Sequence, residues 1–408
     1  RRKACPSSVG PTPPTSTMHH LTKSAAETWP AHLGALIGQG VAAIDTPALV
    51  VDLDAMERNL ATMAAFARQH GVKLRPHAKM HKSATLARLQ MQAGAVGVCV
   101  QKTSEAEALA AGGVDDIYIS NEVIAPHKLQ RVAALARTLA ARDGRLAIAV
   151  DSPYGVQALA QALGLGENLI DVFIELDVGQ NRCGVAEPAD VLPLAQAITQ
   201  QPALRLAGLQ AYNGRAQHLR SVAERRVALD AVLARVQQAR ALVEASGLSL
   251  PLVTGAGSGT FGLEAASGVF GELQAGSYLF MDADYARNDL DPAQPRFEHA
   301  LFVKSQVMSV SAGRVVVDAG HKSHAIDSGL PSVHGLALEC TGCNDEHSTL
   351  RAAAADGALP ALGEVLWLIP GHCDPTVNLH DWMVGVRGGL QSGTVEQLIR
   401  VSARGALS

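Results

Sequence analysis

Three groups of residues in this sequence could do chemistry together. The first is Arg75-Pro76-His77-Ala78-Lys79. A lysine at a strand end, beside Arg75 and near His77 and Lys82, has neighbours that would lower its pKa. A lowered pKa is what an amine needs to form a Schiff base. Read by itself, Lys79 is more often a solvated surface lysine, so its interpretation depends on the rest of the chain.

The second group is the glycine-rich segment 254–260, TGAGSGT, which follows an apolar stretch and leads toward a helix. Its backbone N–H groups could approach a phosphate at the helix start. Gly257, Gly259 and Gly262 also spell G-x-G-x-x-G, with Asp282 twenty positions further on, but a dinucleotide-binding motif belongs to a first βαβ unit. In a barrel, the last two loops are the usual phosphate site, and 275–277 could close on the same group.

The third group lies in Gly371-His372-Cys373-Asp374-Pro375. In an extended chain, residues two apart point to the same side, so His372 and Asp374 would present a nitrogen and an oxygen to one ion. Mixed ligation with open positions suits Mn²⁺, Mg²⁺ or Zn²⁺. The pattern alone is weak, because pairs such as His380-Asp381 arise easily.

Cysteines are sparse, with six in 408 residues. This number is too small for a disulfide scaffold and is typical of a reducing intracellular compartment, the cytoplasm or an organelle. Cys340 and Cys343 form a C-x-x-C with His347 nearby, but no second pair follows at zinc-finger spacing. We therefore interpret them as two thiols flanking a turn.

Alternating strands and helices must position these groups. Eight strand–helix units over about 230 residues predict an α/β fold with a (β/α)₈ TIM-type barrel, and a doubly wound open sheet is the alternative. Aromatic residues make up only 4% of the chain, which suits a barrel interior packed with Val, Ile, Leu and Ala. The expected strands centre on Leu74, Val98, Ile117, Ile148, Phe173, Leu206, Leu252 and Leu273, and the expected helices cover 54–69, 83–92, 104–111, 126–141, 188–200 and 222–245.

After residue 284 the sequence shows strand patterns without long helical patterns, which predicts a second, mainly β domain. We expect the barrel at 45–285, a β domain with the metal site at 286–408, and a segment at 18–44 that packs with the β domain. Ser311-Ala312-Gly313 predicts a hairpin turn. A short strand at 48–51 is expected at the start of the barrel segment, and the expected strands of the β domain are 302–310, 314–318, 365–369, 382–387 and 395–401.

The ends and the charge bound the remaining possibilities. Residues 1–26 contain no Asp or Glu and are rich in Ser, Thr and Pro, which is typical of a transit-peptide remnant or of a non-native leader before Met18. Residues 1–17 are expected to be disordered. The formal net charge is −4 and no basic stripe offsets it, which argues against nucleic-acid binding. The sequence contains no apolar run of about 18 residues, so it predicts no membrane-spanning helix.

Together, these features resemble the fold-type III pyridoxal phosphate enzymes, in which an alanine-racemase-like barrel precedes a β domain, and among them most of all the D-threonine aldolases. The resemblance runs from Asp45 to Gly405. Its most specific stretches are RPHAK at 75–79, QKTSE at 101–105, ISNE at 119–122, DVGQNRCGV at 177–185, QAGSY at 274–278 and HCDPT at 372–376.

The resemblance implies a cofactor site and a metal site. Lys79 would carry pyridoxal 5'-phosphate, and Gln274 would face the pyridine nitrogen, where a neutral amide makes the cofactor a moderate electron sink. The metal ligands would be His372, which is also catalytic, and Asp374, with Mn²⁺ or Mg²⁺ favoured and Zn²⁺ possible. The cofactor-binding residues would be Lys79, Arg182, Tyr212, Gln274, Ser258, Gly259, Gly276 and Ser277. Glu122, His218, His321 and His347 could line the mouth or have structural roles.

The implied reaction is retro-aldol cleavage of D-threonine and related D-3-hydroxy amino acids to glycine and an aldehyde. One alternative is a D-serine or D-threo-3-hydroxyaspartate dehydratase, which the resemblance associates with His and Cys two apart, whereas Asp374 holds the second position here. Another is a non-catalytic pyridoxal phosphate carrier, a class that lacks the β domain. Such enzymes are generally head-to-tail homodimers, so cofactor and metal residues could meet across chains.

Overall fold

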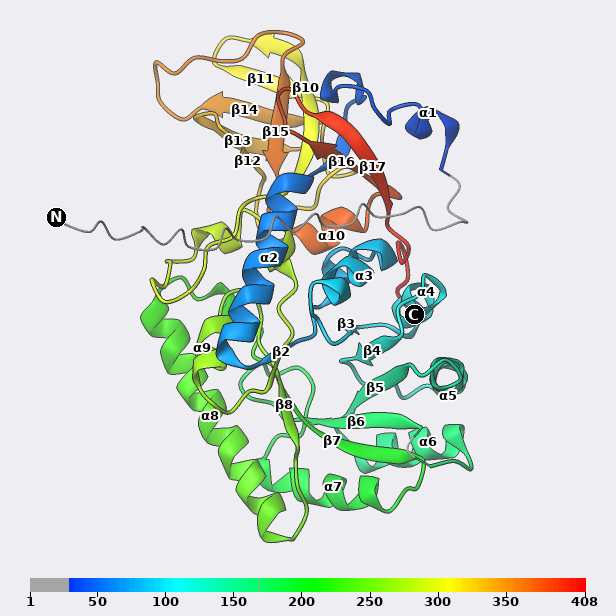
Figure 1. Cartoon of the computed structure of the whole chain (residues 1–408). Helices are drawn as coiled ribbons and strands as arrows, with labels where there is room; N and C mark the ends of the chain where they lie inside the picture. Colours follow the sequence, from blue (N-terminus) through cyan, green and yellow to red (C-terminus); the bar gives the residue numbers. More distant parts are fainter. Residues whose placement is uncertain (1–28, 168) are drawn as a thin grey trace, which may run out of the picture.

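The computed structural model describes residues 29–167 and 169–408, so the expected leader at 1–17 and part of the segment 18–44 lie outside the described residues. Two β-sheets organise the fold, one of eight strands and one of nine. Figure 1 shows the helix-covered eight-stranded sheet below and the other sheet above, with helix α2 (Leu53–His70) between them. Within the described ranges, no helix is both long and apolar enough to cross a membrane.

The eight-stranded sheet is parallel and closes into a barrel. Its strand order is β2-β9-β8-β7-β6-β5-β4-β3. A bridge joins His77 to Cys99, and the amides of Val96 and Cys99 donate to the carbonyls of Leu74 and Pro76, each at 2.9 Å. These bonds connect β2 to β3 and confirm the predicted barrel over an open sheet. The strands are β2 (Lys73–Leu74), β3 (Val98–Val100), β4 (Asp116–Ile119), β5 (Arg145–Val150), β6 (Ile170–Glu175), β7 (Leu204–Ala211), β8 (Leu252–Gly255) and β9 (Glu272–Leu273).

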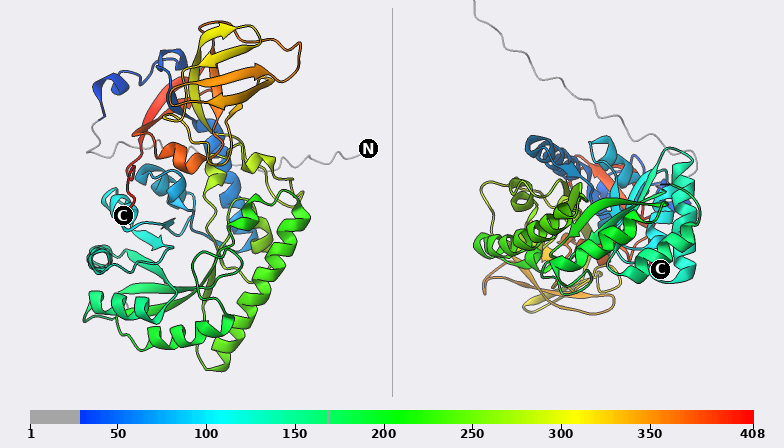
Figure 2. Two further views of the ribbon diagram at one scale, coloured as in Figure 1. Left: turned by 180° about the vertical axis from the view of Figure 1, so that it is seen from behind. Right: turned by 90° about the horizontal axis from the view of Figure 1, so that it is seen from below.

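Helices cover the outside of the barrel because each carries an apolar face. In α5 (Pro126–Ala140), Leu129, Val132, Ala136 and Leu139 recur at helical spacing and are buried. The view from below in Figure 2 shows helices around the strands. The others are α3 (Ala84–Gln92), α4 (Thr103–Ala111), α6 (Pro153–Leu163), α7 (Val191–Thr199), α8 (Val222–Ala245) and α9 (Phe261–Ala266).

The barrel interior differs from the expected aliphatic filling. Side chains alternate along each strand, and the Val, Ile and Leu positions pack against the helices. The alternate positions form a separate cluster of Cys99, Tyr118, Ala147, Ala149 and Phe173, with the two aromatic rings 4.8 Å apart. The prediction of an aliphatic interior is wrong because both faces of a barrel strand are buried, and composition does not tell which face a residue takes.

The nine-stranded sheet forms the second body of the fold. Its order is β11-β14-β13-β12-β15-β10-β1-β16-β17, and β10 also pairs with β11, so part of it closes into an antiparallel barrel. The antiparallel pairing of β10 and β11 confirms the predicted hairpin. The strands are β1 (Ala48–Asp52), β10 (Leu301–Ser311), β11 (Arg314–Val317), β12 (Ser332–Val333), β13 (Leu338–Cys343), β14 (Ser348–Ala352), β15 (Val365–Ile369), β16 (Trp382–Arg387) and β17 (Thr394–Arg400); the short helices are α1 (Ala31–Gly34) and α10 (Cys373–Val377).

Strand β1 belongs to this second sheet, although the expected barrel segment 45–285 includes it. It runs antiparallel to β10 and parallel to β16. The preceding residues also contact this sheet, since the amides of Gly38 and Val41 donate to the carbonyls of Val395 and Gly393. Apolar periodicity identifies a strand but not the sheet that it joins, because pairing depends on contacts far along the chain.

The two neighbouring cysteines lie within a strand rather than on either side of a turn. Cys340 and Cys343 belong to β13, and the register shifts between Cys340 and Gly342. The turn follows them and connects β13 to β14. Among the described residues, all five cysteines are free thiols.

Candidate active site

A cavity at the mouth of the barrel gathers most of the predicted site residues. It lies between the C-terminal ends of the barrel strands and the segment that follows β15 in the second sheet. Gly259 is outside it and lines a neighbouring cavity that shares Ser258. The predicted residues that line the first cavity are Lys79, Arg182, Tyr212, Gln274, Ser258, Gly276, Ser277, His372 and Asp374.

Lys79 and the predicted metal pair meet within one chain. Lys79 lies in a 3₁₀ turn (Ala78–Met80) after β2, and its Nζ is 3.5 Å from Oδ2 of Asp374. Burial is the largest single influence on the pKa of Lys79 and lowers it, but the Asp374 carboxylate and the Tyr212 hydroxyl together outweigh burial and raise the pKa above its ordinary value. Lys79 and the His372–Asp374 pair therefore lie close together within a single chain, and no partner chain is needed to bring them together.

The cations that were expected to lower the Lys79 pKa face carboxylates of their own. Arg75 forms ion pairs with Asp116 and Glu272, and Lys82 Nζ lies 2.9 Å from Oε1 of Glu105. The expected lowering is wrong because residues adjacent in sequence at a strand end point in different directions. His77 does line the cavity, and burial lowers its pKa well below the ordinary value, so its ring is neutral.

The glycine-rich loop lies between β8 and α9. Ala256 has a φ of 73°, and a Cβ at Gly259 would lie 2.6 Å from the backbone carbonyl oxygen of Gln217, so glycine is needed at position 259. The Ser258 Oγ accepts the amide of Tyr278 at 2.9 Å, which leaves its own proton free to donate to an anion. The Gly259 amide already donates to Gln217 Oε1 at 3.0 Å.

Gln274 follows β9 at the buried floor of the cavity. Its Nε2 donates to Thr254 Oγ1 at 2.8 Å and to Gln210 Oε1 at 3.4 Å. The Thr254 hydroxyl donates in turn to Oε1 of Glu272 at 2.9 Å, so its oxygen acts as the acceptor toward Gln274. These bonds set the orientation of the amide and leave Gln274 Oε1 as an acceptor for a bound group.

Arg182 and Tyr212 occupy the loops after β6 and β7. The Arg182 guanidinium carbon lies 6.0 Å from the centre of the Tyr212 ring, within range of a cation–π contact. Burial raises the pKa of Tyr212, so its hydroxyl stays protonated near neutral pH. The pair therefore offers a cation and an aromatic face to the same side of the cavity.

His372 and Asp374 are brought together by a helix start rather than by extended chain. His372 has extended dihedrals and precedes α10, whereas Asp374 lies in the first turn of α10. The His372 Nε2 is 3.7 Å from Asp374 Oδ1, and this oxygen is buried without a hydrogen-bond partner. By contrast, Nε2 of His380 is hydrogen-bonded to the carbonyl of Ser323 at 2.8 Å. The His380-Asp381 pair therefore does not offer an ion a free Nε2 as the His372–Asp374 pair does.

The site contains few protein groups for a metal. Over residues 29–167 and 169–408, no group of three or more His, Cys, Asp or Glu side chains is arranged to hold an ion. Cys373, between the two candidate ligands, is fully buried with its Sγ directed to the carbonyl of Met281 at 3.4 Å. A metal here would have two protein ligands and positions open to water or substrate.

Sequence reasoning missed several residues around the cavity. Asp327 accepts from Nδ1 of His372 at 2.6 Å, although no motif marks it. Gln101 and Ser120 lie beside the His77 ring, at 3.0 and 3.3 Å from its Nε2, and both fall in stretches that carry the family resemblance. Their position directly after β3 and β4 is the signal that could have found them.

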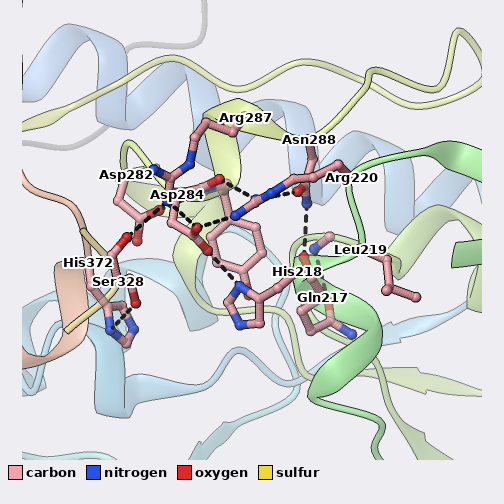
Figure 3. Close-up of polar contacts among 12 residues, drawn as sticks. Gln217, His218, Leu219, Arg220, Asp282, Asp284, Arg287, Asn288, Ser328 and His372 are labelled. Atoms are coloured by element: carbon pink, nitrogen blue, oxygen red, sulfur yellow. Dashed lines mark hydrogen bonds and ion pairs between the residues drawn. The ribbon is translucent and has the colours of Figure 1, made fainter. Parts of the chain in front are cut away.

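A second histidine–carboxylate pair faces the cavity from the barrel side. Nδ1 of His218 lies 2.6 Å from Oδ2 of Asp284, which also binds Arg220 and Arg287 (Figure 3). Burial alone would raise the pKa of Asp284, but these three partners hold it at about 2. Of the four residues expected near the mouth, His218 lines the cavity, whereas Glu122, His321 and His347 do not.

Known proteins resemble this chain over most of its length. Residues 51–284 match the family described as alanine racemase, N-terminal domain, and residues 300–386 match the putative serine dehydratase domain. The chain is 45% identical over 371 residues to a D-threonine aldolase from Arthrobacter sp, covering 90% of this chain and 95% of the relative. It is 43% identical over 378 residues to a 3-hydroxy-D-aspartate aldolase from Paracoccus denitrificans (strain Pd 1222), covering 91% and 95%. The crystal structure of D-threonine aldolase from Filomicrobium marinum has a TM-score of 0.86 at 44% identity, covering 91% of this chain and 99% of that chain.

Proposed function

The chain belongs to the fold-type III family of pyridoxal phosphate enzymes, and we propose that it cleaves D-threonine and related D-3-hydroxy amino acids to glycine and an aldehyde. It is a carbon–carbon lyase of the aldolase type. The observation that carries this proposal is that Lys79 and the His372–Asp374 pair face one cavity, with Nζ 3.5 Å from the carboxylate. An amine anchor beside a metal pair is the arrangement that a cofactor- and metal-dependent cleavage needs.

The cavity fits pyridoxal 5'-phosphate. Lys79 would anchor the cofactor, and Ser258, Gly276 and Ser277 would hold its phosphate. The free hydroxyl proton of Ser258 and the acceptor oxygen of Gln274 support this placement. Arg182 and Tyr212 would flank the cofactor ring. The backbone N–H of Gly259 would join the phosphate site only if its hydrogen bond to Gln217 Oε1 were broken. The bound cofactor supplies a sink for the electron pair left on Cα.

The second pair of residues fits a divalent cation. Asp374 Oδ1 is buried without a partner, and His372 Nε2 lies 3.7 Å away, so an ion between them would satisfy both. We favour Mn²⁺ or Mg²⁺ over Zn²⁺, because two protein ligands leave most positions to water and substrate. The bound ion would lower the pKa of the substrate's β-hydroxyl.

The protein side chains then divide the work. His372 acts through the metal, because a nitrogen that binds an ion cannot take up a proton at the same time. The β-hydroxyl proton leaves as the Cα–Cβ bond breaks, and Cα takes up a proton to give glycine. Lys79 Nζ and His218 Nε2 face the cavity and could carry these protons, since Asp284 occupies only Nδ1 of His218.

A dehydratase of D-serine or D-threo-3-hydroxyaspartate is the main alternative. The Sγ of the buried Cys373 donates a hydrogen bond to the carbonyl of Met281, and Cys373 does not line the cavity. Asp374 is therefore the residue available beside His372, which favours the aldolase. A cofactor carrier is the second alternative, and the presence of the His372–Asp374 pair argues against it.

Incubation of the purified protein with D-threonine and Mn²⁺, with and without a chelator, separates these functions. Acetaldehyde and glycine identify the aldolase, and we expect the chelator to abolish them. Formation of 2-oxobutanoate and ammonia would identify a dehydratase. Absence of any product, with cofactor bound, would leave the carrier.

We also propose that two chains form a head-to-tail homodimer. Exposed apolar side chains, Met308 and Val310 on β10 and Leu362 in the turn before β15, support a partner surface there, since burial of such groups is favourable. The mass in solution, measured by light scattering, should be that of two chains. A monomer at micromolar concentration would contradict this proposal.

A further inference from the structure

Asp327 contacts the nitrogen of His372 that faces away from Asp374. Its Oδ2 lies 2.6 Å from His372 Nδ1, and the Ser328 hydroxyl lies 3.4 Å from the same nitrogen. Asp327 belongs to the loop between β11 and β12, whereas His372 directly precedes α10. Two segments separated by 45 residues therefore meet at one imidazole ring.

The identity of this partner determines which nitrogen can bind a metal. A carboxylate only accepts hydrogen bonds, so Nδ1 of a neutral His372 must carry the proton. The lone pair then lies on Nε2, the nitrogen 3.7 Å from the unpartnered Oδ1 of Asp374. Metal-binding histidines commonly donate their other N–H to a carboxylate, which sets the tautomer and the ring orientation.

We propose that Asp327 is a positioning residue of the metal site, which holds His372 with Nε2 directed toward Asp374. This inference rests on the proposed function, because it assumes that the His372–Asp374 pair binds a divalent ion. Asp327 touches neither substrate nor cofactor and acts through His372 alone. It completes a set of three residues, of which the sequence pattern revealed only two.

A purely structural role for this contact explains less. The Asp327 side chain is 52% exposed, and exposed ion pairs contribute little to folding stability. The neighbouring Ser328 also reaches Nδ1, so the loop would keep a link to the ring without the carboxylate. The specific contribution of Asp327 is therefore the protonation pattern of the imidazole rather than attachment of the loop.

The test measures metal binding rather than turnover. Cofactor-loaded protein, freed of metal with a chelator, is titrated with Mn²⁺ in the native form and as D327A and D327N. We expect the dissociation constant for Mn²⁺ to rise roughly 10- to 100-fold in D327A and less in D327N, whose amide oxygen can still accept. The matched control S328A should change it less than about threefold, because a neutral hydroxyl at 3.4 Å is a weak partner.

Two further measurements keep the outcome interpretable. The thermal midpoint of metal-free D327A should match that of the native protein, and nitrogen NMR of the histidines should show the Nδ1–H form of His372 only while Asp327 is present. Native-like Mn²⁺ affinity in D327A overturns the inference and leaves the aldolase proposal standing. Failure of the native protein to bind Mn²⁺ overturns both the metal site and this inference.

Discussion

The two sides of the cavity are prepared for their ligands in different ways. On the barrel side, Gln274 and Ser258 already have protein partners and are held in one orientation. On the side of the second sheet, Asp374 has one oxygen without a partner and the other near Lys79. The barrel therefore supplies a preorganised cradle, whereas the metal side is completed only when an ion binds. Damage to the two sides should have different signatures.

The largest effect is expected at the anchor on the barrel side. Lys79→Ala should lower activity by roughly 10³-fold or more. It should also remove the absorbance band at about 420 nm, where a Schiff base between a lysine and pyridoxal phosphate absorbs. The exposed lysine of β2 provides the matched control, and Lys73→Ala should retain both band and activity. A Lys79→Ala protein that keeps the band would show that another group anchors the cofactor.

The next effect is expected on the metal side, where the cofactor should stay bound. Asp374→Asn should lower kcat/KM by about 10²- to 10³-fold, since a Lewis acid contributes several kcal/mol, and excess Mn²⁺ should restore part of the loss. Asp381→Asn, which removes a carboxylate paired with Arg404, is the control. Equal rates of Asp374→Asn with and without chelator, at the native level, would argue against a metal at this pair.

A smaller effect concerns the cluster at the seam between the two sides. The pKa of Asp284 is about 2 in the folded protein, below its ordinary value of 3.8, so its carboxylate stabilises the fold above pH 4. This stabilisation is lost as the pH falls toward 2. The difference in unfolding free energy between the native protein and Asp284→Asn should therefore shrink by about 1.5 kcal/mol from pH 5 to pH 2.5. Denaturant titrations at both pH values measure it, and a constant difference would contradict the ion-pair cluster.

The smallest effect tests the preorganisation of the barrel side. Thr254→Val removes the acceptor that orients Gln274 and should weaken cofactor binding by roughly fivefold, equivalent to about 1 kcal/mol. Fluorescence titration with pyridoxal phosphate measures this change. Thr138→Val, which loses a hydroxyl contact to the Ala134 carbonyl on α5, should have no effect. Unchanged affinity in Thr254→Val would mean that the Gln274 orientation does not matter for the cofactor.

The barrel was predictable because its strands carry a strong local signal. All eight expected strand centres lie in or beside observed strands, since strands buried on both faces form short continuous apolar runs. The strands β12, β13 and β14 were missed for the opposite reason. In β13 only Leu338 is buried, so the segment shows no apolar alternation.

The candidate site was predictable where a motif marks it and not where it depends on distant partners. Lys79, Ser258, Gly276 and His372 were named from short patterns and now line one cavity. Asp327 and the Thr254–Glu272 contact were not, because a carboxylate in a loop or a threonine in a strand has no distinctive spacing. The Gly259 amide was expected to face the phosphate, yet a side chain from the preceding loop occupies it.

The sequence by itself determined which chemical groups are present, the alternation of strands and helices, and the loops in which the groups lie. These properties depend on local periodicity and on residue type. Only the tertiary structure decided which charges meet. Lys79 faces Asp374 rather than Arg75, and His372 faces Asp327, because electrostatic interactions and hydrogen bonds depend on distance in space and not on separation along the chain.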